Sequence, residues 1–248
     1  MRIGIIGTGH MARTLGTAWA RAGHDIAITG RSPAKARTLA TTIGAAAAVA
    51  VGVDEVGVGR DAVLVAVPWD AAEHMVARAR VPVGTVLIDA TNAVPHGGGT
   101  LLVGPGESMA GRLSQAAPGA RVVKAFHTFP FTQWLQPVPD APLAVSGASA
   151  PNAKAEPGAG AEKTEGVPLV AMCGDEPEAL EVVGELARDL GGEPVVLGRM
   201  ERARQLEEVA AFVISLAFAG RDPSAAVPAV PAVPAVPAVP AVPAVPAV

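Results

Sequence analysis

Residues 1–37 constrain the fold more than any other part of the chain. A short apolar stretch over residues 2–6 is followed at once by Gly7-Thr8-Gly9-His10-Met11-Ala12, and a helical pattern of apolar residues then runs to Ala22. Gly23 ends that pattern, and residues 24–29 form a second apolar stretch. The order of strand, G-x-G-x-x-A turn, helix and strand is the fingerprint of a dinucleotide-binding unit.

The small residues of the fingerprint each have a physical role. Gly7 permits the tight turn, Gly9 lets backbone N–H groups approach a pyrophosphate, and Ala12 lets helix and strand pack closely. The phosphates then lie at the positive end of the helix. The alternative is a glycine-rich turn that binds nothing, and the flanking strand and helix patterns favour nucleotide binding over it.

The end of the second strand indicates which nucleotide is bound. A site for unphosphorylated NAD usually places an acidic residue here for the ribose 2′-hydroxyl, but residues 29–35 contain no Asp or Glu. Thr29 and Ser32 offer hydroxyls, and Arg31 and Lys35 offer positive charge; arginine matches a phosphate with two parallel hydrogen bonds. Two alternatives remain, that Ser32 only caps a helix starting at Pro33 and that Lys35 is only a solvated helix residue. We predict NADP rather than NAD.

The rest of the first 136 residues alternates apolar strands with helical patterns. The spacing predicts helices over residues 33–43, 70–80 and 107–117, and strands over 45–53, 62–67, 85–89 and 121–126. Asp70 is the expected N-cap of the second of these helices. Continuous apolar strands separated by helices are typical of a parallel sheet covered on both faces. The expected fold class is α/β, a Rossmann-type, doubly wound, mostly parallel sheet.

Composition divides the remainder of the chain. We predict an NADP-binding Rossmann domain over residues 1–136, followed by a Pro-, Ala-, Gly- and Ser-rich linker or surface insertion over 137–166. Residues 167–220 form a small C-terminal α/β unit, with strands over 167–173 and 194–197 and helices over 177–190 and 200–219. A unit this small buries little surface alone, so we expect it to pack on the first domain. Residues 221–248 are expected to be a disordered tail of Ala-Val-Pro repeats, because proline at every third position is incompatible with helix and sheet interiors.

Bulk properties narrow the class of protein. A net charge of −4 argues against nucleic acid as a partner, and no apolar run reaches the ~18 residues that a membrane span needs. The single cysteine, Cys173, fits a cytoplasmic protein and is expected to be a buried residue rather than a nucleophile. Met1 leads directly into the first strand, so we expect no signal peptide. The apolar stretch over residues 209–219 predicts a buried or interfacial helix that is compatible with a homodimer.

Ligands of such sheets bind outside the carboxyl ends of the strands. There, residues 126–131 gather three of the five phenylalanines around His127, a combination that suits a planar heterocycle. Three alternatives stay open: His127 is an ordinary loop histidine, Pro68 and Trp69 are core residues rather than a nicotinamide wall, and Asn92 caps a turn rather than binding cofactor.

The sequence shows no constellation for general acid–base catalysis apart from His127, the one candidate catalytic residue, since Lys124 lies on the strand before it. Reduction of a ketone or imine normally needs a proton donor, whereas hydride transfer between two cofactors mainly needs stacking. The histidines show no metal-like spacing with cysteine or carboxylates, and we expect no metal site.

Several motifs together resemble one family. They are Ile5-Ile6-Gly7-Thr8-Gly9-His10-Met11-Ala12, Gly30-Arg31-Ser32-Pro33-Ala34-Lys35-Ala36, Val67-Pro68-Trp69, Lys124-Ala125-Phe126-His127-Thr128-Phe129-Pro130, Cys173-Gly174-Asp175 and Arg202-Ala203-Arg204-Gln205-Leu206. Their combination is similar to the NADPH-dependent F420 reductases, also called F420H2:NADP oxidoreductases, over most of residues 1–136 and 167–220. F420 is a deazaflavin coenzyme.

The resemblance implies hydride transfer between NADP(H) and F420, which would be the co-substrate, with the two rings stacked. It implies a pyrophosphate held by Gly7, Thr8, Gly9, His10 and Met11, and a 2′-phosphate held by Thr29, Arg31, Ser32 and Lys35. It places Val67, Pro68 and Trp69 at the nicotinamide and His127 and Phe129 at the deazaflavin. Two alternatives are a related NADPH reductase acting on flavin, ferric ion or a small imine, and a non-catalytic NADP sensor or scaffold.

Overall fold

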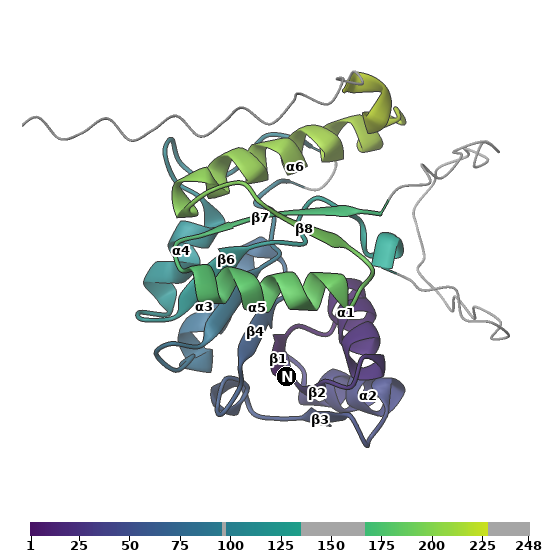
Figure 1. The fold of residues 1–248 in the computed structure, drawn as a ribbon, viewed down its shortest axis with the longest axis vertical. Helices are drawn as coiled ribbons and strands as arrows, with labels where there is room; N and C mark the ends of the chain where they lie inside the picture. Colours follow the sequence, from purple (N-terminus) through teal and green to yellow (C-terminus); the bar gives the residue numbers. More distant parts are fainter. Residues whose placement is uncertain (96–97, 135–166, 228–248) are drawn as a thin grey trace, which may run out of the picture.

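The computed structural model describes residues 1–95, 98–134 and 167–227, and Figure 1 shows a single sheet running through the molecule. The predicted linker over 137–166 and residues 228–248 of the predicted tail lie outside these residues. Residues 223–226 of that tail form a short 3-10 helix rather than the expected disordered segment, because the Asp222 side chain accepts the Ser224 N–H and caps it. Eight strands follow the order β3-β2-β1-β4-β5-β6-β7-β8. The strands are β1 (Arg2–Ile6), β2 (Asp25–Thr29), β3 (Ala48–Ala50), β4 (Ala62–Val65), β5 (Val86–Asp89), β6 (Arg121–Lys124), β7 (Leu169–Gly174) and β8 (Glu193–Val196). All neighbours pair in parallel except β6 and β7, which confirms the mostly parallel α/β fold.

Helices cover both faces of the sheet. The bounds are α1 (His10–Arg21), α2 (Pro33–Ile43), α3 (Trp69–Ala79), α4 (Met109–Ala116), α5 (Pro177–Arg188) and α6 (Ala203–Phe218), with short 3-10 helices η1 (Val53–Glu55), η2 (Phe131–Trp134), η3 (Met200–Arg202) and η4 (Pro223–Ala226). One core packs α1, α2 and α5 on one face, and a second core packs α3, α4 and α6 on the other. Among the described residues, no helix is long and apolar enough to cross a lipid bilayer.

Element boundaries differ from the predicted ones at several positions. The predicted strand over 45–53 is reduced to Ala48–Ala50, because its alanines bury too little surface to extend pairing with β2. The helix predicted from residue 107 starts at Met109, since the Ser108 hydroxyl accepts the Gly111 N–H and caps it. Asp70 is not the N-cap predicted for α3. Pro68 takes that position, because its fixed φ leads directly into the helix at Trp69. The last helix begins as the 3-10 turn η3 before α6.

The C-terminal residues continue the same sheet. Val123 and Lys124 of β6 pair with Gly174 and Cys173 of β7, and β8 follows β7 in parallel. On the α1 side, the indole Nε1 of Trp19 donates to the Leu186 carbonyl of α5 at 3.0 Å. Trp19 therefore joins the nucleotide-fingerprint helix to the C-terminal helix across one core.

We predict that Trp19→Ala lowers the free energy of unfolding by about 3–5 kcal/mol, because it removes a fully buried aromatic ring and leaves a cavity. Unfolding in urea followed by circular dichroism measures the change. The control is Val83→Ala at a site that is 82% exposed, where a change within about 0.5 kcal/mol is expected. A Trp19→Ala loss no larger than the control's would contradict the bridging role.

Candidate functional site

A pocket of about 530 Å³ lies at the carboxyl ends of β1, β2 and β4. This is the point where the strand order reverses, and open α/β sheets place ligands there. Its lining residues come from the fingerprint turn, the loop after β2 and the loop after β4: Gly7, Thr8, Gly9, Gly30, Arg31, Ser32, Lys35, Ala66, Val67 and Pro68. Eight of the fifteen residues predicted for binding are therefore gathered in one pocket.

The fingerprint turn leaves an open anion cradle. Gly7 has a φ of 146°, its N–H donates to the Thr29 carbonyl at 2.8 Å, and a Cβ there would collide with the Ala66 carbonyl. Gly9 is different, because a Cβ built on it would meet no atom within 4 Å. Gly9 is also the N-cap of α1, with no side-chain cap and no acidic residue in the first turn. The positive end of α1 therefore faces free space that suits a phosphate.

Two cations stand beside this cradle. Arg31 and Lys35 are exposed, and neither side chain has an ion pair or hydrogen bond with any described residue. The Ser32 hydroxyl accepts the Lys35 backbone N–H at 3.4 Å, so the predicted helix cap is confirmed while Ser32 still lines the pocket. Unpartnered cations next to a free helix N-terminus give the pocket a strongly anion-binding character.

The other predicted binding residues near the fingerprint lie outside the pocket lining. Thr29 is buried beneath the turn and contributes its carbonyl to Gly7. Met11 and Trp69 are partly buried and pack against the two cores. His10 stacks on Phe131 with ring centroids 4.6 Å apart and an interplanar angle of 19°. That stack brings the loop after β6 over the start of α1, a contact between segments that sequence spacing does not reveal.

A second group of predicted residues lies at the ends of β5 and β6. Asn92 Nδ2 donates to the His127 carbonyl at 2.7 Å, which joins the two loops. The Phe129 ring meets the Trp134 ring edge-on at 5.5 Å. The His127 side chain is only 3% exposed, yet neither ring nitrogen has a hydrogen-bond partner among the described residues. The Asn92 Oδ1 and Trp134 Nε1 atoms are likewise buried without partners.

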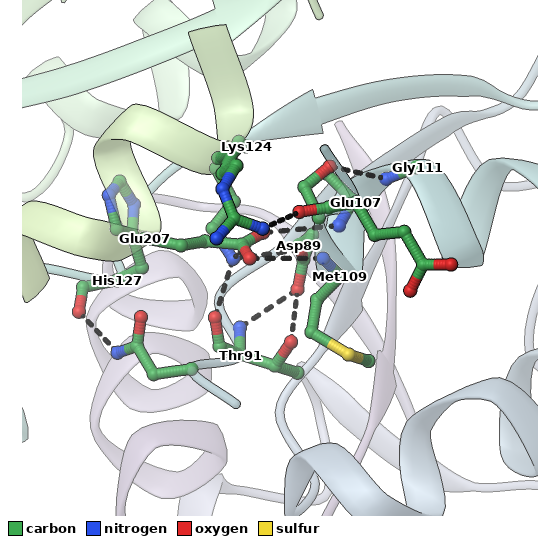
Figure 2. A network of polar contacts seen from close by, with 12 residues as sticks. Asp89, Thr91, Glu107, Met109, Gly111, Lys124, His127 and Glu207 are labelled. Carbon is green, nitrogen blue, oxygen red and sulfur yellow. Dashed lines mark hydrogen bonds and ion pairs between the residues drawn. The ribbon is translucent and has the colours of Figure 1, made fainter. Parts of the chain in front are cut away.

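Figure 2 shows a buried ionic cluster next to these loops, which we name the Lys124 cluster and define as Asp89, Lys124 and Glu207. Lys124 Nζ lies 2.9 Å from Asp89 Oδ2 and 3.2 Å from Glu207 Oε1, and all three side chains are 0% exposed. Lys124 lies on the strand where the sequence predicts it, but its partners Asp89 and Glu207 were not predicted. The sequence does contain a signal for this cluster. A charged residue ends each of the apolar strands β5 and β6, and Glu207 lies on the buried side of α6.

Comparison with known proteins finds a family match for the segment that builds the nucleotide pocket. Residues 2–93 match the family model described as NADP oxidoreductase coenzyme F420-dependent. The resemblance to the F420-dependent NADP oxidoreductases is confirmed. Among curated proteins, no sequence matches this chain.

Solved structures share the fold beyond the matched segment. The hypothetical protein SMa0349 from Sinorhizobium meliloti is 26% identical, with a TM-score of 0.62 over 82% of this chain and 86% of its own. A candidate F420-dependent NADP-reductase from Arthrobacter sp. FB24 is 20% identical, with a TM-score of 0.67 over 88% and 95%. The Aspergillus terreus reductive aminase in complex with NADPH and ethyl-5-oxohexanoate is 18% identical, with a TM-score of 0.57; 88% of this chain covers 63% of that protein. The last two likenesses show a common Rossmann-like fold.

Two buried side chains of this region, His127 and Cys173, have altered pKa values. Burial, and second the positive charge of Lys124, lower the pKa of His127 to about 3. The nearby backbone groups of Leu206 and Ala125 raise the pKa and so oppose this shift, although neither has hydrogen-bond geometry with a ring nitrogen. Burial raises the pKa of the Cys173 thiol to about 11, which agrees with the predicted buried, unreactive cysteine. His127 is thus a neutral imidazole at neutral pH.

We predict that His127 makes the protein sensitive to acid. Unfolded histidine has a pKa of about 6.5, so below that pH the unfolded state binds a proton that the folded state excludes. The free energy of unfolding should therefore fall as pH drops from about 6.5 toward 3, by up to ~1.4 kcal/mol per pH unit. His127→Phe keeps a ring in the site and removes the titration, so between pH 7 and pH 5 it should lose about 2 kcal/mol less than the wild type.

Urea unfolding at the two pH values measures this difference. The exposed His74→Gln is the matched control and should behave as the wild type does. A His127→Phe protein that loses as much stability as the wild type between pH 7 and pH 5 would contradict the neutral, buried histidine.

Proposed function

We propose that the protein transfers a hydride between NADP(H) and the deazaflavin coenzyme F420. The observation that carries the nucleotide part is the pocket in which the uncapped start of α1 lies beside the unpartnered Arg31 and Lys35. Such a pocket provides for more negative charge than a pyrophosphate alone, and the extra 2′-phosphate of NADP supplies it. The family match over residues 2–93 supports the same nucleotide.

The residues present fit the two cofactors. The open side of Gly9 is the cradle that a side chain would fill, and Thr8, Ser32, Arg31 and Lys35 surround it. In this proposal Val67 and Pro68, which line the pocket after β4, lie toward the nicotinamide. The ring nitrogens of His127 and the Asn92 Oδ1 are buried and have no partner among the described residues, so in this proposal they are the polar groups left over for a second ligand. When bound, the two cofactors supply the redox chemistry, a hydride passing from one ring to the other.

The acidity of His127 supports a cofactor as the acceptor. A histidine whose pKa is about 3 carries no transferable extra proton at neutral pH, so it is a poor proton donor for reducing an imine or ketone. As a neutral imidazole it still offers one donor and one acceptor, which suits orienting a polar heterocycle. The proposal therefore gives His127 an orienting role.

Purified protein mixed with NADPH and F420 tests the assignment. We expect NADPH oxidation together with bleaching of the deazaflavin absorbance. Free flavin, ferric ion and a small imine are tested in parallel as acceptors. Turnover with one of these and none with F420 would select the related-reductase alternative, and tight NADPH binding without turnover on any acceptor would select the non-catalytic alternative.

We predict that Arg31→Ala weakens NADPH binding by about 1.5–3 kcal/mol, the value of a hydrogen-bonded contact to a charged group, and leaves NADH binding nearly unchanged. Dissociation constants for both nucleotides, measured by nucleotide fluorescence, give the comparison. Arg37→Ala is the control, because Arg37 is an exposed arginine of α2, the helix that follows Arg31, and does not line the pocket. Equal losses for NADPH and NADH would show that Arg31 does not read the 2′-phosphate.

A further inference from the structure

The Lys124 cluster is fully satisfied, although it is cut off from solvent. Lys124 Nζ donates to Asp89 Oδ2 and to the Thr91 carbonyl, and it forms an ion pair with Glu207 Oε1. Asp89 Oδ1 accepts both the backbone N–H of Thr91, at 2.8 Å, and its hydroxyl, at 2.7 Å. The ammonium and Asp89 together therefore hold the turn that follows β5.

Glu207 ties this turn to the C-terminal helix. Its carboxylate accepts the N–H of Met109 at 3.0 Å and that of Ala110 at 3.3 Å, so a residue of α6 caps the first turn of α4. The cluster contains two carboxylates and one ammonium, and the positive end of α4 compensates the excess negative charge. Arg204, one turn earlier on α6, donates to the Glu107 carbonyl at 2.9 Å and strengthens the same attachment. Figure 2 shows Glu207 close to Lys124, Asp89 and Met109.

The loops held by the cluster are those that carry Asn92 and His127. Asn92 follows Thr91 directly, His127 lies three residues beyond Lys124, and the two loops are joined by the Asn92–His127 hydrogen bond. No member of the cluster lines the nucleotide pocket. Stability alone does not explain the cluster, because replacing a complete buried ion set by neutral residues of similar volume is often neutral or stabilising. A function that depends on the geometry of these loops explains it better.

We propose that Lys124 and Glu207 are positioning residues for the electron acceptor. They fix the loops over residues 89–92 and 124–127, and through them the polar groups of Asn92 and His127, so that acceptor binding depends on the attachment of α6. This inference rests on the proposed function. It predicts that changes in the Lys124 cluster alter the affinity for the electron acceptor and leave the affinity for NADP unchanged.

The test compares two adjacent glutamates on α6. Glu207→Gln keeps the shape of the side chain and removes the buried charge, whereas Glu208→Gln changes an exposed glutamate that pairs with Arg204 at 2.9 Å. In Glu207→Gln the dissociation constant of F420, measured with NADP+ present so that no turnover occurs, should rise about tenfold, the effect of losing one hydrogen bond. The dissociation constant of NADP+ should stay within about twofold, and Glu208→Gln should match the wild type in both.

Two further measurements separate positioning from folding and from the proposed function. The triple variant Asp89→Asn, Lys124→Met, Glu207→Gln keeps acceptors for Thr91 and for α4 without buried charge, so it should fold and show the same loss of F420 affinity. Hydrogen exchange of the Asn92 side-chain amide, followed by NMR, needs no ligand and should be faster in Glu207→Gln than in Glu208→Gln.

Unchanged F420 affinity in the folded variants, or equal losses for F420 and NADP+, would overturn the positioning role. A wild-type protein that binds no F420 would overturn the proposed function instead. In that case the Asn92 exchange rates still decide: unchanged exchange in Glu207→Gln would show that the cluster does not hold the loops.

Discussion

Burial of both faces of one parallel sheet is the constraint from which the rest of the molecule follows. Helices α1, α2 and α5 cover one face, and α3, α4 and α6 cover the other, so apolar side chains pack against both faces of the sheet. The polar residues of the candidate site lie at the carboxyl ends of the strands, where the loops leave the two cores. Even there the backbone is close-packed, since Gly7 has no room for a Cβ beneath Ala66. The candidate site therefore lies just beyond the packed cores, and the strand order determines its position along the edge of the sheet.

Polar groups at that edge of the sheet have three physically different environments. At the ends of β1 and β2 they are left open: the start of α1 has no side-chain cap, and Arg31 and Lys35 have no described partner. At the ends of β5 and β6, Asp89 and Lys124 are buried and fully paired with one another and with Glu207. His127 is buried and unpaired, and stays neutral because burial lowers its pKa to about 3. The open cations and helix start suit an anion, and the paired ionic groups suit a rigid scaffold. The buried, unpaired imidazole suits an uncharged ligand that forms hydrogen bonds.

Local features of the sequence were enough to predict the first of these regions. The glycine spacing at residues 7–12, the absence of acidic residues over 29–35 and the apolar runs of the strands each report on short-range structure, and the structure gathers Gly7, Gly9, Arg31 and Lys35 in one pocket. Boundaries were less predictable where two local signals compete, as at Pro68 and Asp70, both reasonable helix starts. There the fixed φ of proline and the burial of Trp69 decide the outcome.

The second region depends on contacts between distant segments, and no local pattern contains them. Glu207 meets Met109 and Lys124 because β7 reverses direction beside β6 and returns the chain so that α6 lies over α4. Residue Leu206 of the same helix places its backbone near the His127 ring, and His127 is 3% exposed. A charged residue on the apolar side of α6 looks, in sequence, like an interruption of the helix pattern. A buried carboxylate is tolerated only when it is paired, so a glutamate in this position is evidence for a cationic partner elsewhere in the chain. Lys124, a charged residue at the end of an apolar strand, is that partner.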